Sequence, residues 1–473
     1  MTDGIQVLRT ALGGGSAWLV GGVLRDRALG RAAEPVDLDV IVEGDPAAAA
    51  RAVARAAGGA ACFALSEEFG AWRVVSRDRS WQADVEPMRG GSVEEDLALR
   101  DFTVNAVAEP LGGGEPIDPL GGLADARAGR LRMAGPTAFA DDPLRVLRLV
   151  RVALQLDLEV DAETFDQARA AVEGLGGVAS ERVFAELRRI LASTGAVRGM
   201  EMMGELGATA VVLPELDGLR GVEQSRYHHR DVYGHTLEVL ERTVELTGPG
   251  GLAAAELGGA IGELGPAVCE ILAQPLADDM TRGEALRWGA LLHDAAKPLT
   301  REVRGADGRV TFIGHDSLGA DLARDVLARL RASERLRSHV AALVRHHLRL
   351  GFLVHEPQPL SRRAVFAYLR ACVPVEVDVT LLSVADRLAT RGERAQESID
   401  AHLMLAGGVL LDAVRWDREG PPRPLVRGDE LAEALGIATG PRVGALLEEL
   451  AAAQYAGEVR TREQALAYAR GLA

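Results

Sequence analysis

The sequence predicts an α+β protein, with a mixed sheet near the N-terminus and helices in the rest of the chain. Short apolar runs typical of strands occur only within about the first 110 residues. From about Pro136 onward, apolar residues recur at helical spacing. The length of 473 residues exceeds what a single hydrophobic core usually serves. Several domains are therefore expected.

Four segments near the N-terminus are predicted strands, and they read AWLVGG, DLDVIV, AWRVVS and WQADVEP. The last two are joined by the charged turn 77–79 and are expected to form a hairpin. Further along, residues 245–284 are rich in Gly and Ala and are interpreted as a loosely helical insertion. Residues 418–428 carry Arg and Pro and are interpreted as a linker before a final small helical unit.

Composition sets limits on location and partners. The net charge of −16 argues against a general nucleic-acid coat protein, although a local basic cleft is compatible with it. No secretory signal and no apolar run of membrane-span length is visible. The three cysteines are scattered, as in reduced cytosolic proteins. A cytoplasmic protein without a membrane partner is expected.

The segment VDLDVIV places two carboxylates on one strand face, those of Asp37 and Asp39. Adjacent carboxylates repel each other unless a positive charge lies between them, and a metal ion is the usual solution. Such a pair suits two-metal phosphoryl transfer. Gly21 and Gly22 allow the backbone to approach phosphate oxygens, and Arg25 adds a charge-assisted contact. The alternative is a pair of solvated side chains on an edge strand.

A second pair, Asp142 and Arg145, lies three residues apart at the predicted start of a helix, so both side chains share a face. A carboxylate beside a guanidinium offers an acceptor next to a donor. Cytosine and adenine both present an amino donor beside a ring-nitrogen acceptor, so this pair selects C and A without a template. The alternative is an ordinary ion pair on a solvated helix.

Four motifs occur in order: GGVLRD with VDLDV, RDFTVNA, DDPLRVLR and SERVFAELRRIL. In the order and spacing of these motifs, roughly the first 220 residues resemble the bacterial class of tRNA nucleotidyltransferases and poly(A) polymerases. The resemblance implies a polymerase-beta-like head in which Asp37 and Asp39 are catalytic and bind Mg²⁺, followed by helical neck, body and tail regions. It also implies a set of nucleotide-binding residues: Gly21, Gly22, Arg25, Arg100, Asp101, Asn105, Asp142, Arg145, Arg148 and Arg151. Two residues depart from the family pattern, Leu99 for an Arg and Asp141 for a Glu.

Most of the ten histidines fall in four later segments, which contain YHHRDVYGHTLEVL, GALLHDAAKP, FIGHDSLGADLA and LVRHHLRLG, and a fifth segment, SVADRLAT, adds an aspartate. Imidazoles with carboxylates suit a divalent metal and a water nucleophile. The order resembles the HD-domain phosphohydrolases, although Ala296 replaces a glycine of the HDxGKP pattern. The resemblance implies the ligands His235, His293, Asp294 and Asp386, with His315 and His347 at a second-metal position and His346 as the alternative to His347. The expected ion is Mn, Ni, Co or Mg.

Together these features predict four parts: a nucleotidyltransferase head (1–135), a neck and body that bind RNA and nucleotide (136–222), an α-helical HD domain (223–395) and a helical C-terminal region (396–473). The predicted enzyme adds C, A or both to the tRNA 3′ end from CTP and ATP, and carries HD phosphohydrolase activity. A poly(A) polymerase is the nearest alternative. An alternative from another functional class is a protein that works mainly as an HD phosphohydrolase on RNA ends. A pure binding module is the least expected, because binding alone has no use for two metal sites.

The connection from WQADVEP to the acidic helix that begins at Glu94 is short, with Gly90 and Gly91 in a tight turn. Full CCA-adding members of the family have a flexible loop there, and C-only adding members have a shortened one. The resemblance therefore implies an enzyme that adds two C residues well and A poorly. The alternative is that LGGGEP at 111–116 takes over the role of the loop.

Overall fold

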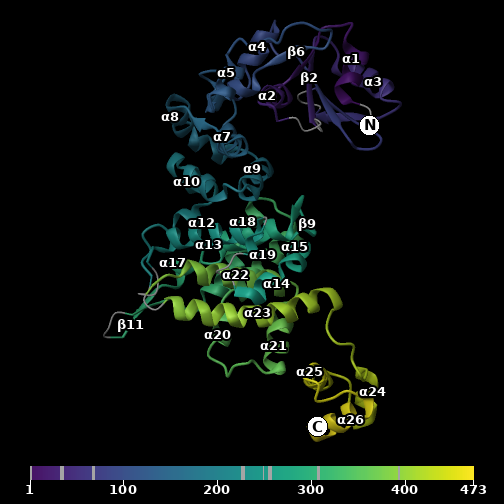
Figure 1. The fold of residues 1–473 in the computed structure, drawn as a ribbon, viewed down its shortest axis with the longest axis vertical. Coiled ribbons are helices and arrows are strands. Elements are labelled where there is room, and N and C mark those ends of the chain that lie inside the picture. The colour runs from purple at the N-terminus through teal and green to yellow at the C-terminus, as the bar shows by residue number, and fades with distance from the viewer. Residues whose placement is uncertain are drawn as a thin grey trace. The chain divides into compact units, whose positions relative to one another are not determined.

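The computed structural model describes residues 3–31, 37–66, 70–224, 229–248, 250–253, 258–305, 309–392 and 395–472 (Figure 1). The chain divides into two compact units, and each is described by itself. Unit 1 contains residues 1–178 and 205–212, and unit 2 contains residues 179–204 and 213–473.

Unit 1 is built on a mixed six-stranded sheet in the order β3-β4-β5-β2-β1-β6. Strands β2 and β5 are parallel, and the other neighbours are antiparallel. The strands are β1 Ala17–Val20, β2 Asp37–Val42, β3 Ala61–Ser66, β4 Ala71–Val75, β5 Gln82–Pro87 and β6 Ala108–Pro110. The predicted α+β class and the β4–β5 hairpin are confirmed. The sequence did not reveal β3 and β6, which lie at the two edges of the sheet, where fewer apolar side chains are needed.

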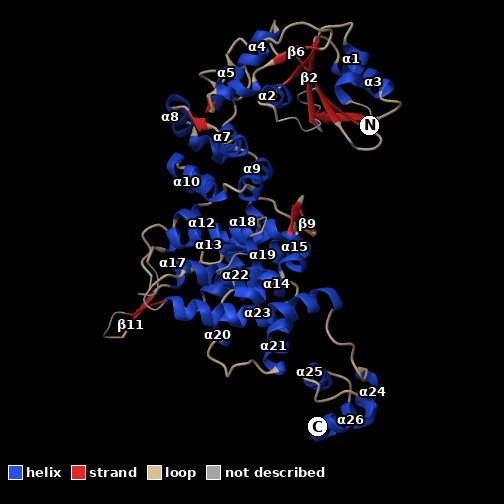
Figure 2. Cartoon of the chain, in the orientation of Figure 1, coloured by secondary structure: helices blue, strands red, loops and turns tan. Residues whose placement is uncertain are grey.

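Alternation along β2 assigns its residues to the two sides of the sheet. Leu38, Val40 and Val42 pack in a core beneath helices α1 Gly4–Leu12 and α3 Pro46–Ala56. Figure 2 shows these helices beside the strands of the head. Ile41 packs on the other side, with Leu97 of helix α4 Val93–Ala98. The acidic residues Asp37 and Asp39 therefore share the face of Ile41, as predicted.

The rest of unit 1 is mainly helical. Its α-helices are α2 Gly22–Ala28, α5 Gly122–Arg127, α6 Ala138–Asp141, α7 Arg145–Leu156, α8 Ala162–Ala170 and α11 Ala208–Val212, and a 3₁₀ helix spans Val172–Gly177. Helix α7 buries its apolar residues along one side, and it ends at Asp157 in the left-handed conformation.

Unit 2 is a helical array around α16 Arg282–Leu292, whose residues are all buried except the half-buried Glu284. A capping box formed by Thr281 and Glu284 fixes its first turn. The surrounding helices are α9 Ser180–Ala192, α12 Pro214–Asp217, α13 Val232–Thr247, α14 Gly258–Glu263, α15 Gly265–Leu272, α17 Lys297–Thr300, α18 His315–Arg329, α19 Glu334–His346, α20 Arg349–Leu353, α21 Arg362–Cys372, α22 Glu376–Ala389 and α23 Ala395–Glu419. Helix α10 Ala196–Leu206 spans the boundary between the units.

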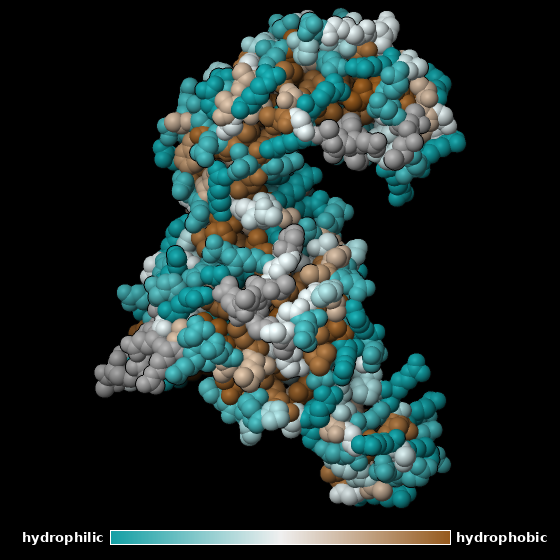
Figure 3. Space-filling view, viewed as in Figure 1, coloured by the Kyte–Doolittle hydropathy of each residue, from teal (hydrophilic) through white to brown (hydrophobic). Residues whose placement is uncertain are grey.

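The C-terminal end of unit 2 has a small core of its own, contributed by α24 Gly428–Leu435, α25 Pro441–Tyr455 and α26 Arg462–Leu472. The predicted linker corresponds to the non-helical residues 420–427. No helix among the described residues is both long and apolar enough to cross a membrane. On the face shown in Figure 3, hydrophilic residues cover much of each unit, and patches of hydrophobic residues are visible among these hydrophilic residues.

The expectation that strands end before Pro136 is wrong in detail. Short two-stranded ribbons join β7 Arg130–Leu131 to β8 Glu159–Val160, β9 Pro275–Ala277 to β10 Met280–Thr281, and β11 Glu302–Arg304 to β12 Arg309–Thr311. Strands of two or three residues are too short to produce a readable alternation. The predicted loose insertion at 245–284 contains the ordered helix α15 and the β9–β10 ribbon, while its residues 249 and 254–257 lie outside the described part of the chain.

Candidate active sites

The head site is formed at the N-terminal half of β2. Asp39 lies opposite Val20 of β1, and Gly21 follows directly after that strand. A Cβ atom at Gly21 would lie 3.2 Å from Asp39 Oδ2, and the φ of Gly21 is +81°. The backbone conformation therefore favours glycine at this position, and the space beside Asp39 is tight for any side chain. The Arg100 guanidinium lies close to the same point, 3.9 Å from that Cβ position.

The electrostatics of this face favour a bound cation. Asp39 remains accessible along the strand, yet protein atoms surround its carboxyl group. The loss of water raises the pKa of Asp39 to about 6, against the opposing charge of Arg100. The carboxyls of Glu86, Asp84 and Asp37 raise this pKa further. A metal ion between these carboxylates would relieve the repulsion.

Two of those acidic residues, Asp84 and Glu86, were not found from the sequence. The parallel pairing of β2 with β5 sets Asp84 directly opposite Asp39 and Glu86 opposite Ile41. Alternation within QADVEP puts both on one strand face, but only the strand pairing brings that face beside Asp39. The Asp84 carboxylate accepts two 2.7 Å hydrogen bonds from Arg73 of β4.

Two residues of the RDFTVNA motif, Asp101 and Asn105, form a hydrogen-bond network with Arg25 and Arg148. Arg25 donates to Asn105 Oδ1 at 2.5 Å, and Asn105 donates to Asp101 Oδ1 at 3.1 Å. Arg148 of α7 donates to Asp101 Oδ2 at 2.6 Å. Burial by itself raises the pKa of Asp101, but Arg148 and Asn105 outweigh it and hold this pKa below its usual value. This hydrogen-bond network connects α2 and α7 to the RDFTVNA segment, so these side chains position one another in this structure.

The predicted base-reading pair differs from expectation in its local geometry. Helix α7 begins at Arg145, so Asp142 precedes the helix in an extended conformation and accepts from the Leu144 N–H at 3.2 Å. The Arg145 guanidinium donates to the carbonyl oxygens of Leu99, Arg100 and Ala138. Arg145 therefore lies next to the RDFTVNA segment, while Arg151, further along α7, donates to Gln155 at 3.0 Å.

The second site lies in unit 2, where all six predicted HD residues converge. They are His235 from α13, His293 and Asp294 at the C-terminal end of α16, His315 at the start of α18, His347 directly after α19, and Asp386 from α22. Of the alternatives 346 and 347, the structure turns His347 into the cluster, where it is buried.

Asp294 is at the centre of this cluster. Its Oδ2 atom lies 2.7 Å from Lys297 Nζ and 3.1 Å from His293 Nε2. Its Oδ1 atom lies 3.3 Å from His315 Nε2. Two groups of potential ligand atoms, each within 4.8 Å of one another, share Asp294: one with His235 and His293, the other with His315 and His347. Asp386 Oδ1 lies 3.0 Å from His235 Nε2.

The orientation of the imidazoles tests whether the cluster fits a metal. Nδ1 of His293, His315 and His347 faces a backbone carbonyl oxygen, those of Ala290, Phe312 and Val344, at 2.8, 2.7 and 2.6 Å. Each Nδ1 must therefore carry the proton, which leaves the Nε2 lone pair directed into the cluster. Nε2 of His315 and Nε2 of His347 are 3.3 Å apart. Two lone pairs at this distance repel each other without a cation, so the donor set fits divalent metal ions.

The pKa shifts favour a neutral His347 and an ionised Asp294. Burial lowers the pKa of His347 to about 4, and His293 and His315 lower it further, so this imidazole is neutral at pH 7. Burial alone raises the pKa of Asp294, yet His293 and Lys297 hold it well below its usual value. His347 therefore offers a neutral nitrogen beside the ionised oxygens of Asp294. Asp294 raises the pKa of His293 against the effect of burial, so a metal ion bound at His293 would have to displace a proton.

A cavity of about 710 Å³ opens onto this cluster. Asp294, His315, His347 and Asp386 line it on the ligand side, and its other walls come from the β12–α18 connection, α20 and the first turn of α23. A cavity of this size holds a small organic molecule as well as a phosphate.

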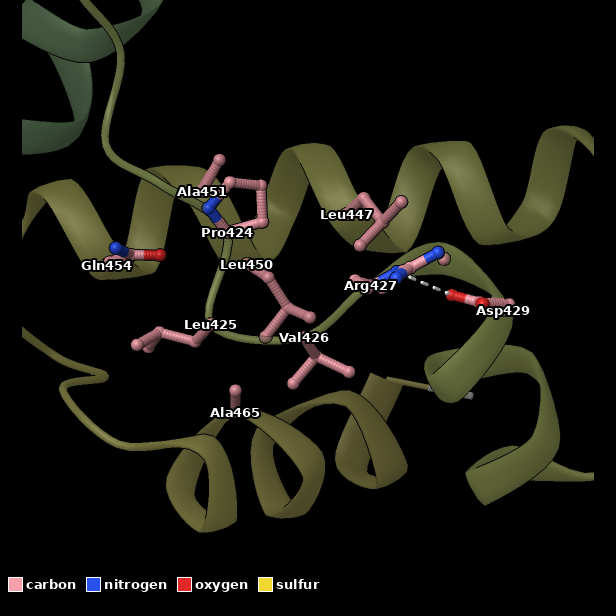
Figure 4. Close-up of a pocket in the computed structure, with 11 residues that line it drawn as sticks. Pro424, Leu425, Val426, Arg427, Asp429, Leu447, Leu450, Ala451, Gln454 and Ala465 are labelled. Atoms are coloured by element: carbon pink, nitrogen blue, oxygen red, sulfur yellow. Dashed lines mark ion pairs between the residues drawn. The ribbon is translucent and has the colours of Figure 1, made fainter.

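Another cavity, of about 450 Å³, lies in the C-terminal helical part (Figure 4). Its lining is mainly apolar and includes Leu425, Val426 and Leu450. Arg427 and Asp429 form an ion pair of 3.3 Å there. The described lining contains a single carboxylate and no imidazole or thiol, so it offers no metal-ligand set.

Comparisons with known proteins agree with this division of chemistry. Residues 17–132 match the family model of the poly(A) polymerase head domain, residues 157–219 match the probable RNA- and SrmB-binding site of polymerase A, and residues 266–391 match the HD domain. Asp37 and Asp39 lie within the first range. The HD range includes the HD-cluster residues except His235, which α13 contributes from outside it.

The chain is 35% identical to the A-adding tRNA nucleotidyltransferase of Deinococcus radiodurans over 96% of this chain and 94% of that protein. The chain belongs to the tRNA nucleotidyltransferase family. The CC-adding tRNA nucleotidyltransferase of Thermus thermophilus is 33% identical over 96% of this chain and 92% of that protein. Family membership confirms the resemblance inferred from the four motifs and the HD segments.

Solved structures share the fold. The Thermotoga maritima CCA-adding enzyme complexed with tRNA has a TM-score of 0.61 at 19% identity, covering 99% of this chain and 95% of that one. A CCA-adding enzyme complexed with ATP has a TM-score of 0.65 at 18% identity, covering 99% and 95%. At this identity the likeness shows that the family fold extends over nearly the whole chain.

Proposed function

We propose that this chain is a template-independent tRNA nucleotidyltransferase that adds C, A or both to the tRNA 3′ end from CTP and ATP. The observation that carries the proposal is the pair Asp37 and Asp39 on one accessible strand face, beside Gly21 with its positive φ and the cation Arg100. Relatives named A-adding and CC-adding, each alike over almost the full chain, support the same activity. A cytoplasmic location, expected from the cysteine pattern, is part of the proposal.

Asp37 and Asp39 are the proposed ligands of Mg²⁺, which prefers carboxylate oxygens. When bound, Mg²⁺ lowers the pKa of an attacking hydroxyl and neutralises triphosphate charge. Gly21 leaves space for the triphosphate to approach the strand end, and Arg100 supplies positive charge there. Gly22, Asp101, Asn105, Arg148 and Arg151 complete the proposed nucleotide site together with Arg25, which acts through Asn105. Asp142 and Arg145 are proposed to read the incoming base.

The test is incubation of the purified chain with a tRNA transcript that lacks its terminal CCA, with each of the four NTPs in turn. Incorporation from CTP or ATP, and not from UTP or GTP, supports the proposal. Addition of a long A tail from ATP would instead support poly(A) polymerase activity.

We further propose that the enzyme adds C well and A poorly. Only residues 88–92 join β5 to α4, and this connection is held by short local bonds. The Gly91 N–H donates to Glu95 at 2.6 Å and the Arg89 N–H to Asp96 at 2.9 Å. A connection fixed in this way is poorly suited to reshape a base pocket between C and A. Identities of 35% and 33% to A-adding and CC-adding relatives do not decide the matter. A tRNA ending in CC, supplied with ATP alone, decides it: efficient addition of one A contradicts the proposal.

The HD unit is proposed to be a phosphohydrolase that acts on RNA ends, with a 2′,3′-cyclic phosphate as the expected substrate group. His235, His293 and Asp294 are proposed to hold one divalent ion, Asp294, His315 and His347 a second one, and Asp386 completes the set. Mn, Ni and Co suit this mixture of nitrogen and oxygen donors better than Mg does. Such ions supply a nucleophilic water at neutral pH. Hydrolysis of 2′,3′-cyclic AMP after loading with Mn²⁺ or Ni²⁺, and its loss with chelator, tests this proposal.

The proposed domain boundaries remain 1–135, 136–222, 223–395 and 396–473. Each range matched by a family model falls within one of the first three parts. Limited proteolysis tests the boundaries, with cleavage expected near residues 135, 222 and 395. Cleavage instead at 420–427, where an irregular segment precedes the C-terminal core, would move the last boundary to that segment.

A further inference from the structure

The cavity of the HD unit has apolar side chains that the metal cluster does not use. Ile313 and Phe352 both line it, although 67% and 66% of their surfaces are exposed. Each lies close in sequence to a proposed ligand, Ile313 before His315 and Phe352 after His347. Leaving a large apolar side chain in water forgoes the free energy that its burial would contribute. At the mouth of a polar cavity, such side chains are available to a ligand.

The remaining lining is polar in a complementary way. Ser398 of α23, Ser383 of α22 and Thr390, which directly follows α22, bring hydroxyl groups to the lining. The hydroxyl groups of Ser383 and Thr390 also bond His402 and the Asp386 carbonyl oxygen, whereas Ser398 is exposed. Lys297 and Arg387 add positive charge near the metal cluster. The cavity thus combines metal ligands and cations for a phosphate, hydroxyl groups for a sugar, and an exposed aromatic ring for a flat apolar group. A nucleotide is the class of molecule that carries all three.

We propose that Phe352, assisted by Ile313, forms a stacking surface for a nucleobase, so that the HD cavity selects phosphoesters that carry a base over those that do not. This inference rests on the phosphohydrolase function proposed above. Stacking recognises the face of a base rather than its edge, so selection among the four bases is weak. The substrate is a free nucleotide or the unpaired last nucleotide of an RNA, since both present the same chemistry.

The test compares two substrates with the same five-membered cyclic phosphate, 2′,3′-cyclic AMP and glycerol 1,2-cyclic phosphate, which has no base. In the full-length chain with Mn²⁺, Phe352→Ala is expected to raise KM for the cyclic nucleotide about tenfold, the size of one lost stacking contact. Its kcat, and both constants for the glycerol compound, are expected to stay unchanged. Ile313→Ala is expected to act in the same direction with a smaller change.

Two further variants control for bulk effects. Phe352→Trp retains an aromatic surface and is expected to keep the wild-type KM. Met404→Ala removes an apolar side chain that is 80% exposed on α23 but does not line the cavity, and it is expected to change neither constant for either substrate.

A short RNA ending in a cyclic phosphate distinguishes a free nucleotide from an RNA end as the substrate. A lower KM for the RNA than for the mononucleotide identifies RNA ends as the substrate.

Equal changes for both substrates in Phe352→Ala, or no change for either, would overturn the inference. If the wild-type chain hydrolyses neither compound, the phosphohydrolase proposal fails, and binding then decides the inference by itself. Equilibrium binding of AMP to Mn²⁺-loaded protein is expected to include a component that weakens about tenfold in Phe352→Ala. Identical binding curves for wild type and variant would contradict the stacking surface.

Discussion

The two proposed metal sites of this chain are built in opposite ways. In the head, Asp37 and Asp39 come from the single strand β2, and both remain accessible. In the HD unit, the ligands come from helices widely separated in sequence, and all except Asp386 are buried. An accessible carboxylate pair suits ions that arrive and leave with a nucleotide. A buried cluster with fixed imidazoles suits ions that stay in place.

The two sites also differ in the atoms that they offer to a metal ion. The acidic face of the head, with Asp84 and Glu86 beside Asp39, offers oxygen atoms alone, which suits Mg²⁺. The HD cluster mixes nitrogen with oxygen, which suits transition metals. The comparison therefore predicts two reactions with different metal requirements and no shared residue.

The largest effect is expected at the head. Asp39→Ala should lower nucleotide incorporation into tRNA by about a thousandfold or more, because loss of a catalytic ion removes several kcal/mol of transition-state stabilisation. Glu43→Gln is the matched control, since it changes an exposed carboxylate just beyond the same strand. Single-turnover assays with CTP measure both. Near-wild-type incorporation by Asp39→Ala would remove this residue from the catalytic set.

A second large effect is expected on metal content. His293→Ala removes an imidazole whose Nδ1 is fixed by the Ala290 carbonyl, so the protein should retain less Mn²⁺ or Ni²⁺ after dialysis and lose cyclic-phosphate hydrolysis. His346→Ala, which changes the neighbour of His347 that lies outside the cluster, is the control. Unchanged metal content in His293→Ala, measured by plasma emission spectroscopy, would contradict the ligand assignment.

These sites also differ in how much the sequence revealed. The carboxylate pair of β2 could be found because a strand period of two places both residues on one face. Asp84 and Glu86 escaped notice because their role depends on the pairing of β2 with β5, which is a tertiary fact. In the HD cluster, motif order identified the ligands but left His346 and His347 as alternatives. Only the end of helix α19 decides which of the two is buried.

The nucleotide-binding predictions illustrate the same limit. Arg25 was expected to contact phosphate, but in this structure it donates to Asn105 and to Asp26. A sequence motif indicates that such a residue belongs to the site, but it does not reveal which group the side chain hydrogen-bonds. The helical regions were readable because long amphipathic periods persist there, whereas ribbons of two or three residues were not.

An intermediate effect is expected on base choice. Asp142→Ala should reduce the preference for CTP and ATP over UTP and GTP by roughly tenfold to a hundredfold, the range for one lost bidentate base contact. Competition assays with mixed NTPs measure the ratio directly. Asp141→Ala, which alters the neighbouring carboxylate, is the control. A uniform loss of rate with unchanged preference would assign Asp142 to local structure, where it accepts from the Leu144 N–H.

The smallest effect concerns stability and leaves both reactions intact. Burial raises the pKa of Glu376 to about 7 from 4.5. The pKa of Glu376 is higher in the folded protein than in the unfolded one. The stabilisation linked to protonation of this side chain is therefore fully present below pH 4.5 and is lost as pH rises through 7. At pH 8, Glu376→Gln should therefore stabilise the protein by up to about 3 kcal/mol, and by less at pH 5. Urea unfolding at the two pH values measures this. Equal effects at both would contradict the shifted pKa.

The central claim is that one chain carries two independent metal sites. The most direct measurement assays both reactions, tRNA nucleotide addition and cyclic-phosphate hydrolysis, in the wild type, in Asp37→Ala/Asp39→Ala and in His293→Ala/Asp294→Ala. The first variant is expected to lose addition and keep hydrolysis, and the second to lose hydrolysis and keep addition. Loss of both reactions in either correctly folded variant would contradict the account.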